Sequence, residues 1–351
     1  MLKYGILFAL FGVAIAPSFA HKPRPCQVTG NIKGLGNKAI VFSYERDGKS
    51  HQDTVRAIND RFSYVAHPSD DGTFTLYIAG PRFTQFWHEP GKLTATGSIN
   101  KPAQLTIVGT PENALLTQYN QQIGWKFNQR MVAHPDSMLA LRQLAQRPTL
   151  NFIKAHPQSR TSANLLYLQA IYDDKPTAEY EQLLRGLSAS VQASPQGQKV
   201  ARRLLILKNQ PIVGRPVPGF TMPDTAGVAV SLDRFKGQYV LLDFWGHWCG
   251  PCIRAMPHLK ALQSQYAREL AVVGIGMEAA DDKKLWMAAI RKHQANWTQL
   301  SELKGDKGVI EQYNITGFPT YLLLDKQGIV LERGRDLGPI EEKLKALLAK
   351  P

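Results

Sequence analysis

The sequence predicts a C-terminal α/β domain that is preceded by a small all-β domain and a helical connector. Up to about residue 110, short runs of β-branched and aromatic residues are separated by Gly or Asp-Gly. Apolar residues at helical spacing, interrupted by prolines, follow up to about residue 210. Beyond that point apolar strands alternate with amphipathic helices, which is typical of a mixed sheet. With 351 residues, the chain is long enough for two or three domains.

Residues 1–20 have the pattern of a secretory signal peptide. Lys3 supplies a positive start, Ile6 to Ala16 form an apolar run, and Ser18-Phe19-Ala20 is a small-x-small cleavage site. That run is too short for a permanent membrane helix, and no later stretch approaches about 18 apolar residues. We therefore expect a protein secreted across the inner membrane into the periplasm (cell envelope), soluble after cleavage before His21.

Cys26 suggests an alternative, a lipid-anchored protein in which it is the acylated residue. Arg24-Pro25 precede it where a lipobox needs small residues, which favours the soluble form. We expect Cys26 to begin a strand and to be buried and inert, with an intermolecular or regulatory thiol as the alternative.

The formal charge of +14 is unevenly distributed. From Ile212 onward, 18 Lys and Arg face 15 Asp and Glu, a net charge of +3, so the preceding residues carry +11. A basic surface favours anionic membranes, acidic partners or nucleic acid. No tight Lys/Arg cluster is interleaved with aromatic residues, so we expect no nucleic-acid partner.

Residues 21–110 are expected to form a β-rich N-terminal domain, either a small sandwich or a barrel-like sheet. Strands are predicted at 27–29, 40–44 and 74–78. Phe83, Phe86 and Trp87 offer a possible ligand-binding face, although core strands give the same pattern.

Residues 111–210 are expected to form the helical connector. Apolar residues recur at helical spacing in four segments, 137–144, 163–168, 178–187 and 199–207. Five prolines are expected to mark the breaks between helices: Pro135, Pro148, Pro157, Pro176 and Pro195.

Residues 211–351 are expected to form the α/β domain, after a segment rich in Pro and Gly. The strand Val240 to Trp245 is apolar except for Asp243. The remaining elements are expected in the order helix 251–266, strand 271–275, helices 283–293 and 308–313, a hairpin of 320–324 and 329–332, and helix 340–348.

The motif that carries chemistry is Trp248-Cys249-Gly250-Pro251-Cys252, between a buried strand and a helix. Two thiols at this spacing can close into a disulfide within one turn. A helix N-terminus presents unpaired N–H groups and a partial positive charge, which favours the thiolate. Because only the thiolate attacks, Cys249 at an exposed leading position is the expected nucleophile, and Cys252 the resolving thiol. Pro251 is tolerated in the first helical turn.

Two alternatives to redox chemistry are disfavoured. A structural disulfide across so short a loop gains little stability. A zinc site would need a second Cys pair or paired His, and the chain has three Cys. We therefore expect no metal and no cofactor.

The segment Val240 to Cys252 resembles the active-site strand, turn and helix start of the thioredoxin superfamily. Gly317-Phe318-Pro319-Thr320 resembles its cis-proline loop. The resemblance implies that Pro319 is cis and lies against the cysteines, and that the Phe318 backbone pairs with an incoming peptide.

Within this superfamily the domain is most similar to secreted TlpA- and ResA-like reductases. The similar segments are Pro218-Gly219-Phe220, Leu232, Phe235-Lys236-Gly237, Met256-Pro257-His258-Leu259 and Asp325-Lys326-Gln327-Gly328. More weakly, residues 26–210 resemble the β-rich and helical region upstream of such reductases, a region that brings no assigned chemistry.

Two carboxylates are candidates for proton handling. Asp243 lies in an apolar strand, where its pKa should rise. Six residues before Cys249, it matches the buried acid of thioredoxins that exchanges a proton with the resolving cysteine. Glu278 ends the strand after the active-site helix and matches an acidic position near the cysteines of ResA-like proteins; a solvated loop carboxylate is the alternative.

The resemblance also bears on direction and partners. A Gly-Pro pair between the cysteines is similar to thioredoxin, at roughly −270 mV, which implies a reductase or isomerase of disulfide-containing protein substrates. Such a protein needs a membrane-embedded electron donor. A homodimer is possible. His247 and Phe318 depart from the usual surroundings, which leaves the redox potential open.

The residues also bear on two other functions. A peroxiredoxin is disfavoured because Gly246 stands three residues before Cys249, where that family needs Thr. The alternative from another class is a cell-surface binding or assembly protein with an accessory redox domain.

Overall fold

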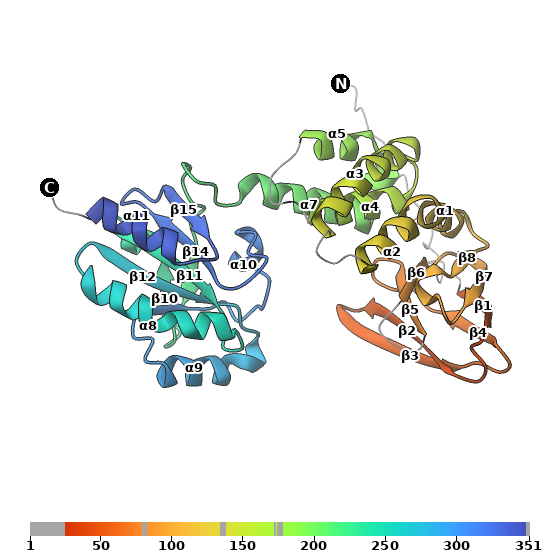
Figure 1. Cartoon of the computed structure of the whole chain (residues 1–351), viewed down its shortest axis with the longest axis horizontal. Helices are drawn as coiled ribbons and strands as arrows, with labels where there is room; N and C mark the ends of the chain where they lie inside the picture. The colour runs from red at the N-terminus through yellow and green to blue at the C-terminus, as the bar shows by residue number, and fades with distance from the viewer. Residues whose placement is uncertain (1–24, 79–82, 134–137, 172, 174–177, 349–351) are drawn as a thin grey trace, which may run out of the picture. The chain divides into compact units, whose positions relative to one another are not determined.

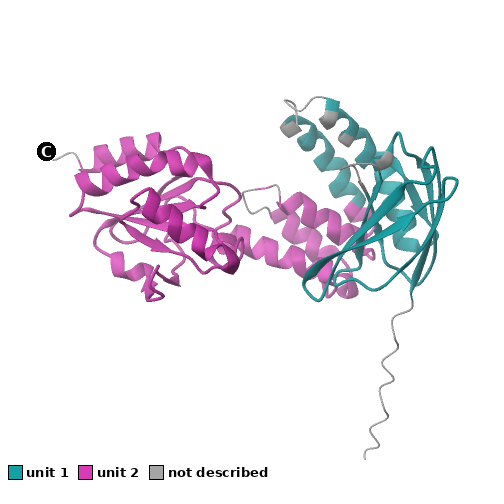
Figure 2. Ribbon diagram, turned by 90° about the horizontal axis from the view of Figure 1, so that it is seen from below, with its two compact units in different colours: residues 1–152 teal, residues 153–351 magenta. Residues whose placement is uncertain are grey.

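The structure is a computed structural model that describes residues 25–78, 83–133, 138–171, 173 and 178–348. The chain divides into two compact units, residues 1–152 and 153–351 (Figure 2). The predicted signal peptide at residues 1–20 lies outside the described residues. Among the described helices, none combines the length and the apolar character needed to span a membrane.

The N-terminal unit contains a β-sandwich (Figure 1). Its sheets have the strand orders β4-β1-β7-β8 and β3-β2-β5-β6. Side chains of both sheets, such as Val28, Phe42 and Leu93, belong to one buried cluster, so the sheets enclose a shared core. The predicted all-β domain is therefore confirmed. The strands are β1 (Cys26–Lys33), β2 (Ala39–Arg46), β3 (Lys49–Arg56), β4 (Arg61–Ala66), β5 (Thr73–Ile78), β6 (Phe83–Trp87), β7 (Gly91–Ser98) and β8 (Thr106–Val108).

The sandwich core accounts for two features of the sequence. Cys26 begins β1, is fully buried and is not in a disulfide. Burial raises the pKa of the Cys26 thiol, which keeps it in its unreactive form. Phe86 and Trp87 are each about 1% exposed, so the idea that they line a ligand-binding face is wrong. Phe86 belongs to the sandwich core, and Trp87, which follows it and points to the opposite face of β6, is buried as well.

Seven α-helices follow the sandwich in the described part of the chain. Pro195 occupies the first turn of α7, as expected of a helix start. Pro148, by contrast, was expected at a break and instead lies inside α3. Burial of Leu150 and Ile153 beyond it, and a hydrogen bond from Thr149 Oγ1 to the Ala145 carbonyl, support the helix across the proline. The helices are α1 (Pro111–Tyr119), α2 (Trp125–Ala133), α3 (Met138–Ala155), α4 (Arg160–Ile171), α5 (Ala178–Gly186), α6 (Ala189–Gln192) and α7 (Pro195–Asn209).

The C-terminal α/β domain is built on a five-stranded sheet of order β13-β12-β11-β14-β15. β12 and β13 run parallel to the central β11, whereas β14 pairs with it antiparallel. The fold is thioredoxin-like, as the resemblance implied. Its elements are β9 (Thr221–Pro223), β10 (Ala229–Ser231), β11 (Tyr239–Trp245), α8 (Gly250–Gln265), β12 (Leu270–Gly276), α9 (Lys283–Lys292), β13 (Thr298–Leu300), α10 (Val309–Gln312), β14 (Thr320–Leu324), β15 (Val330–Gly334) and α11 (Gly338–Leu348).

The two faces of this sheet have separate cores. Alternate residues of β11 divide between them: Leu242 and Phe244 pack with α10 and the β9–β10 hairpin. Leu241 and Trp245 pack with side chains of α8, α9 and α11. Because residues two apart on a strand share a face, Asp243 lies on the second face.

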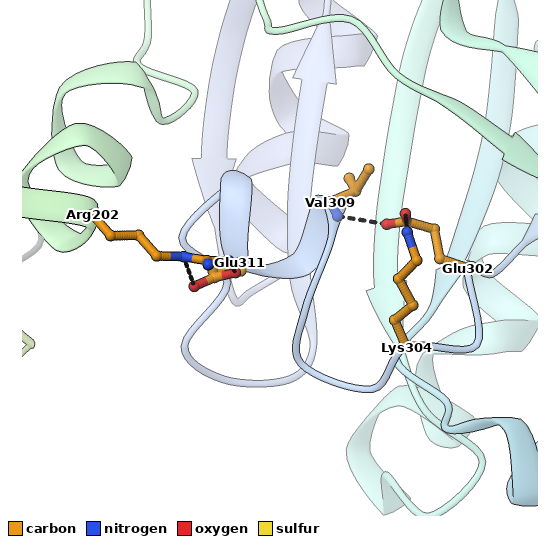
Figure 3. A network of polar contacts seen from close by, with 5 residues as sticks. All are labelled: Arg202, Glu302, Lys304, Val309 and Glu311. Atoms are coloured by element: carbon orange, nitrogen blue, oxygen red, sulfur yellow. Dashed lines mark hydrogen bonds and ion pairs between the residues drawn. The ribbon is translucent and has the colours of Figure 1, made fainter. Parts of the chain in front are cut away.

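Helix α7 is joined to the α/β domain by polar contacts. The Arg202 guanidinium forms a bidentate ion pair with Glu311 of α10 (Figure 3). Arg203 Nη1 donates to Asn314 Oδ1 at 2.6 Å, and Asn314 Nδ2 donates to Gln210 Oε1 at 2.9 Å. The boundary predicted at residues 210 and 211 therefore falls within a bonded region, and the separate domains 111–210 and 211–351 stay a prediction.

Candidate active site

The two cysteines lie where β11 passes into α8. Cys249 is the N-cap of α8, and its Sγ accepts a hydrogen bond from the Cys252 backbone N–H at 3.2 Å. Pro251 lies in the first helical turn, where its missing N–H is not needed. Cys249 and Cys252 form a disulfide with a Cα–Cα distance of 5.3 Å.

The expected exposure of Cys249 is wrong for this disulfide form. Cys249 is 4% exposed and Cys252 is 2% exposed. Both belong to the buried cluster that includes Trp245 and Met256, which accounts for their low exposure. The neighbouring Trp248 is the exposed residue of the motif, at 54%.

Trp248 and the cis-proline loop meet beside the disulfide-bearing turn. The Phe318–Pro319 peptide bond is cis, as the resemblance implied. The Trp248 and Phe318 rings pack edge to face with their centroids 5.6 Å apart. A side chain at Gly246 would meet the Trp248 indole at 2.8 Å, so glycine at this position leaves room for the ring.

Asp243 lies in the middle of β11 and is 1% exposed. Burial raises its pKa to about 8, because charging the carboxylate there loses its hydration. Its Oδ1 atom has no hydrogen-bond partner among the described residues. It pairs across the strands with Tyr321 of β14, which belongs to the cluster that contains both cysteines. A buried acid with a pKa near that of a thiol can exchange a proton with one near neutral pH.

Glu278, just beyond β12, has a fully buried side chain, so it is not the solvated loop carboxylate of the alternative interpretation. Its Oε1 accepts the His247 backbone N–H, and its Oε2 contacts His247 Nδ1, both at 2.7 Å. Burial raises the pKa of Glu278, and the bonds from His247 oppose that rise. The carboxylate thus fixes the loop two residues before Cys249. His247, a departure from the usual active-site surroundings, thus has Glu278 as its partner, a contact that no local sequence pattern predicts.

A groove of about 410 Å³ lies next to Pro251 and Pro319. Apolar side chains such as Ala255 and Leu337 line it together with His258, which lies in a segment similar to the ResA-like reductases, and with three charged residues that the sequence did not indicate: Arg335, Asp336 and Glu341. In the described part of the chain, no cluster of three or more His, Cys, Asp or Glu is arranged to hold a metal ion.

Two family models match the chain, one over the α/β domain and one over the β-sandwich. Residues 213–333 match the model of the AhpC/TSA family, and residues 26–116 match a domain of unknown function, DUF4369. The second match covers the β-sandwich and the start of α1.

Curated relatives match the C-terminal domain. "Thioredoxin-like protein YneN" of Bacillus subtilis (strain 168) is 34% identical over 119 residues, which cover 33% of this chain and 68% of that protein. "Thiol-disulfide oxidoreductase ResA" of Bacillus thuringiensis subsp. konkukian (strain 97-27) is 30% identical over 120 residues, covering 34% and 68%.

Solved structures give matches of similar extent. A thiol-disulfide oxidoreductase from Bacteroides fragilis NCTC 9343 is 33% identical. The match covers 38% of this chain and 100% of that chain, with a TM-score of 0.36. The thioredoxin domain of a thiol-disulfide oxidoreductase from Bacteroides vulgatus is 32% identical, with 38% of this chain and 97% of that chain covered and a TM-score of 0.34. On the identity and coverage of its curated relatives, this chain belongs to the ResA-like thiol-disulfide oxidoreductases of the thioredoxin superfamily.

Proposed function

We propose that this enzyme reduces or isomerises disulfides of envelope proteins through the Cys249–Cys252 dithiol. The observation that carries the proposal is the disulfide at the N-terminus of α8, on the face of the sheet that also carries the buried Asp243. The helix N-terminus stabilises a thiolate at Cys249, and burial gives Asp243 a pKa at which it can exchange a proton.

The exchange runs in two steps from the reduced protein. The Cys249 thiolate attacks one sulfur of the substrate disulfide, and the other substrate sulfur leaves as a thiolate and takes a proton. The Cys252 thiolate then attacks Cys249 Sγ, which releases the second substrate thiol and forms the Cys249–Cys252 disulfide. Two electrons pass to the substrate, and the enzyme is oxidised.

Three neighbouring groups have supporting roles in this proposal. Asp243 accepts the proton of the Cys252 thiol before the second step. Glu278 holds the active-site loop through His247. Trp248, Gly250 and Pro251 shape the turn, and the segment Phe318-Pro319 receives the substrate backbone.

Location and partners rest on the sequence. The leader at residues 1–20 supports secretion to the periplasm, and turnover of a reductase there requires a membrane-embedded electron donor. Residues 21–210 would select substrates or drive dimer formation. No observation in the described residues favours the alternative of a binding protein with an accessory redox domain.

Trapping experiments test the cysteine roles. The Cys252→Ser variant should accumulate mixed disulfides with oxidised protein substrates, because nothing resolves them, whereas Cys249→Ser should form none. Cys26→Ala is the matched control and should behave as the parent chain. Non-reducing gels after incubation with insulin give the readout. Trapping by Cys249→Ser alone would reverse the assignment, and trapping by neither variant would refute the proposed activity.

A further inference from the structure

Arg335 lies directly against the cis-proline loop. A Cβ atom at Gly317 would overlap its guanidinium, so the arginine occupies the space that a side chain at this position would fill. In the part of the chain that the structure describes, its one hydrogen bond is donated by Nη2 to Thr316 Oγ1 at 3.3 Å. Among the described residues, Arg335 forms no ion pair. Its charge therefore faces the groove beside Pro319 without a carboxylate partner.

A second arginine, Arg254, lies in α8, the helix that begins at the disulfide. A Cβ atom at Gly250, between the two cysteines, would lie 3.5 Å from Arg254 Nη1. Arg254 is exposed, on the first turns of α8, and in the described part of the chain it has no carboxylate partner either. The start of α8 and the cis-proline loop therefore each have a glycine with a guanidinium beside it. Neither guanidinium has a carboxylate partner among the described residues.

The carboxylates of the groove are already engaged. Asp336 Oδ1 accepts the Gly338 N–H at 3.0 Å, at the start of α11. Glu341, in the first turn of the same helix, lies 3.7 Å from His258 Nδ1. Both lie at the start of α11, where the partial positive charge of the helix N-terminus, about half an elementary charge, reduces their negative charge without cancelling it. The guanidinium groups next to the disulfide-bearing turn and the cis-proline loop are Arg254, beside Gly250, and Arg335, beside Gly317 in the groove.

We propose that Arg254 and Arg335 select substrate segments that carry carboxylate side chains next to the reactive cysteine. Guanidinium groups pair with carboxylates through parallel N–H donors, and at a rim they act mainly on association and specificity. The net charge of +3 from Ile212 onward acts weakly in the same sense. This proposal rests on the proposed disulfide reductase function and names the substrate class of that same site.

The test uses three disulfide-linked peptides that differ only in the residues flanking cysteine: two Glu, two Gln or two Lys. Reduction by the full chain is followed with dithiothreitol as the electron source, with the rate of dithiothreitol alone subtracted. We expect the Glu peptide to have a kcat/KM about five- to tenfold above that of the Gln peptide at low ionic strength, and the Lys peptide to fall below both. At about 0.5 M salt the three values should converge.

Variants assign the preference to the two residues. Arg335→Gln and Arg254→Gln should each reduce the Glu-to-Gln ratio about two- to fivefold, with little change for the Gln peptide. Gly317→Ala should lower the ratio in the same way as Arg335→Gln, because it displaces the guanidinium and keeps its charge. Arg268→Gln is the control with equal charge loss. It lies beyond the C-terminal end of α8, about 24 Å from the disulfide by the length of that helix.

Three outcomes decide the question. A ratio that disappears in the double variant Arg254→Gln/Arg335→Gln and is unchanged in Arg268→Gln supports the proposal. A preference for the Lys peptide, or a ratio that the double variant leaves unchanged, overturns it. A parent chain that reduces none of the peptides above the dithiothreitol background would refute the proposed function instead.

Discussion

Replacing Asp243 with asparagine removes a buried titratable group and changes little else in the shape of β11. Burial raises the Asp243 pKa from 3.8 to about 8. At about 1.36 kcal/mol per pKa unit, four units correspond to roughly 5–6 kcal/mol between the protonated and charged forms. Water penetration and local relaxation reduce this figure, so about 3–5 kcal/mol is the effect that we expect to measure.

The sign follows from proton binding. Between pH 4 and pH 8, the folded protein keeps the Asp243 proton while the unfolded chain has lost it. This group's contribution to the free energy of unfolding is therefore fully present below pH 4 and decreases as the pH rises towards 8. Above pH 8 the contribution no longer changes with pH. Because asparagine does not titrate, the Asp243→Asn variant should lack this slope and be more stable than the parent chain at pH 8.

Urea unfolding of the oxidised protein from pH 4 to pH 9 measures the difference. Four of the six tryptophans, Trp245, Trp248, Trp286 and Trp297, belong to the C-terminal unit, so tryptophan fluorescence follows mainly this unit. Asp233→Asn, at a side chain that is 68% exposed, is the control and should retain the parent slope. Parallel pH profiles for the parent and the Asp243→Asn variant would show that the carboxyl group is not held neutral by burial, and the proton-transfer role would lose its basis.

Two further predictions concern the active-site loop and the domain boundary. Glu278→Gln removes the carboxylate bound to His247, so the Cys249 thiolate should form at lower pH. The midpoint of the iodoacetamide alkylation profile should fall by about half to one unit, and an unchanged midpoint would contradict this. A fragment of residues 212–351 should be less stable to urea than one of residues 153–351 by about 1–3 kcal/mol, because the buried Asn314 loses its partner Arg203. Equal stability, with equal insulin reduction, would instead support a boundary at 210.

The sequence could predict those parts of the site that are contiguous along the chain. The segment from β11 through Cys252 carries its own signals, because an apolar strand, a helix start and two spaced thiols are all local. The contacts of Glu278 with His247, and of Arg335 with Gly317, join residues 31 and 18 positions apart, and they depend on how the strands pack. No local pattern encodes them.

Other differences have similar causes. The short strands β9, β10 and β13 have three residues each, too few to show a period of two. Pro148 was expected to break a helix because its residue type is a strong local signal, but packing of the following buried residues outweighs that signal. The low exposure of Cys249 likewise depends on the surrounding cluster rather than on its position at a helix start.

The burial of Cys26 gives the molecule a built-in reporter of unfolding. It lies at the start of β1, a strand with a neighbour on each side, and none of its surface is exposed. After reduction of the Cys249–Cys252 disulfide and alkylation of those two thiols, a maleimide can label Cys26 only when the sandwich opens. The labelling rate then measures the opening of the N-terminal unit alone, while tryptophan fluorescence follows mainly the C-terminal unit. The two units can thus be monitored separately within one intact chain, without the introduction of a foreign probe.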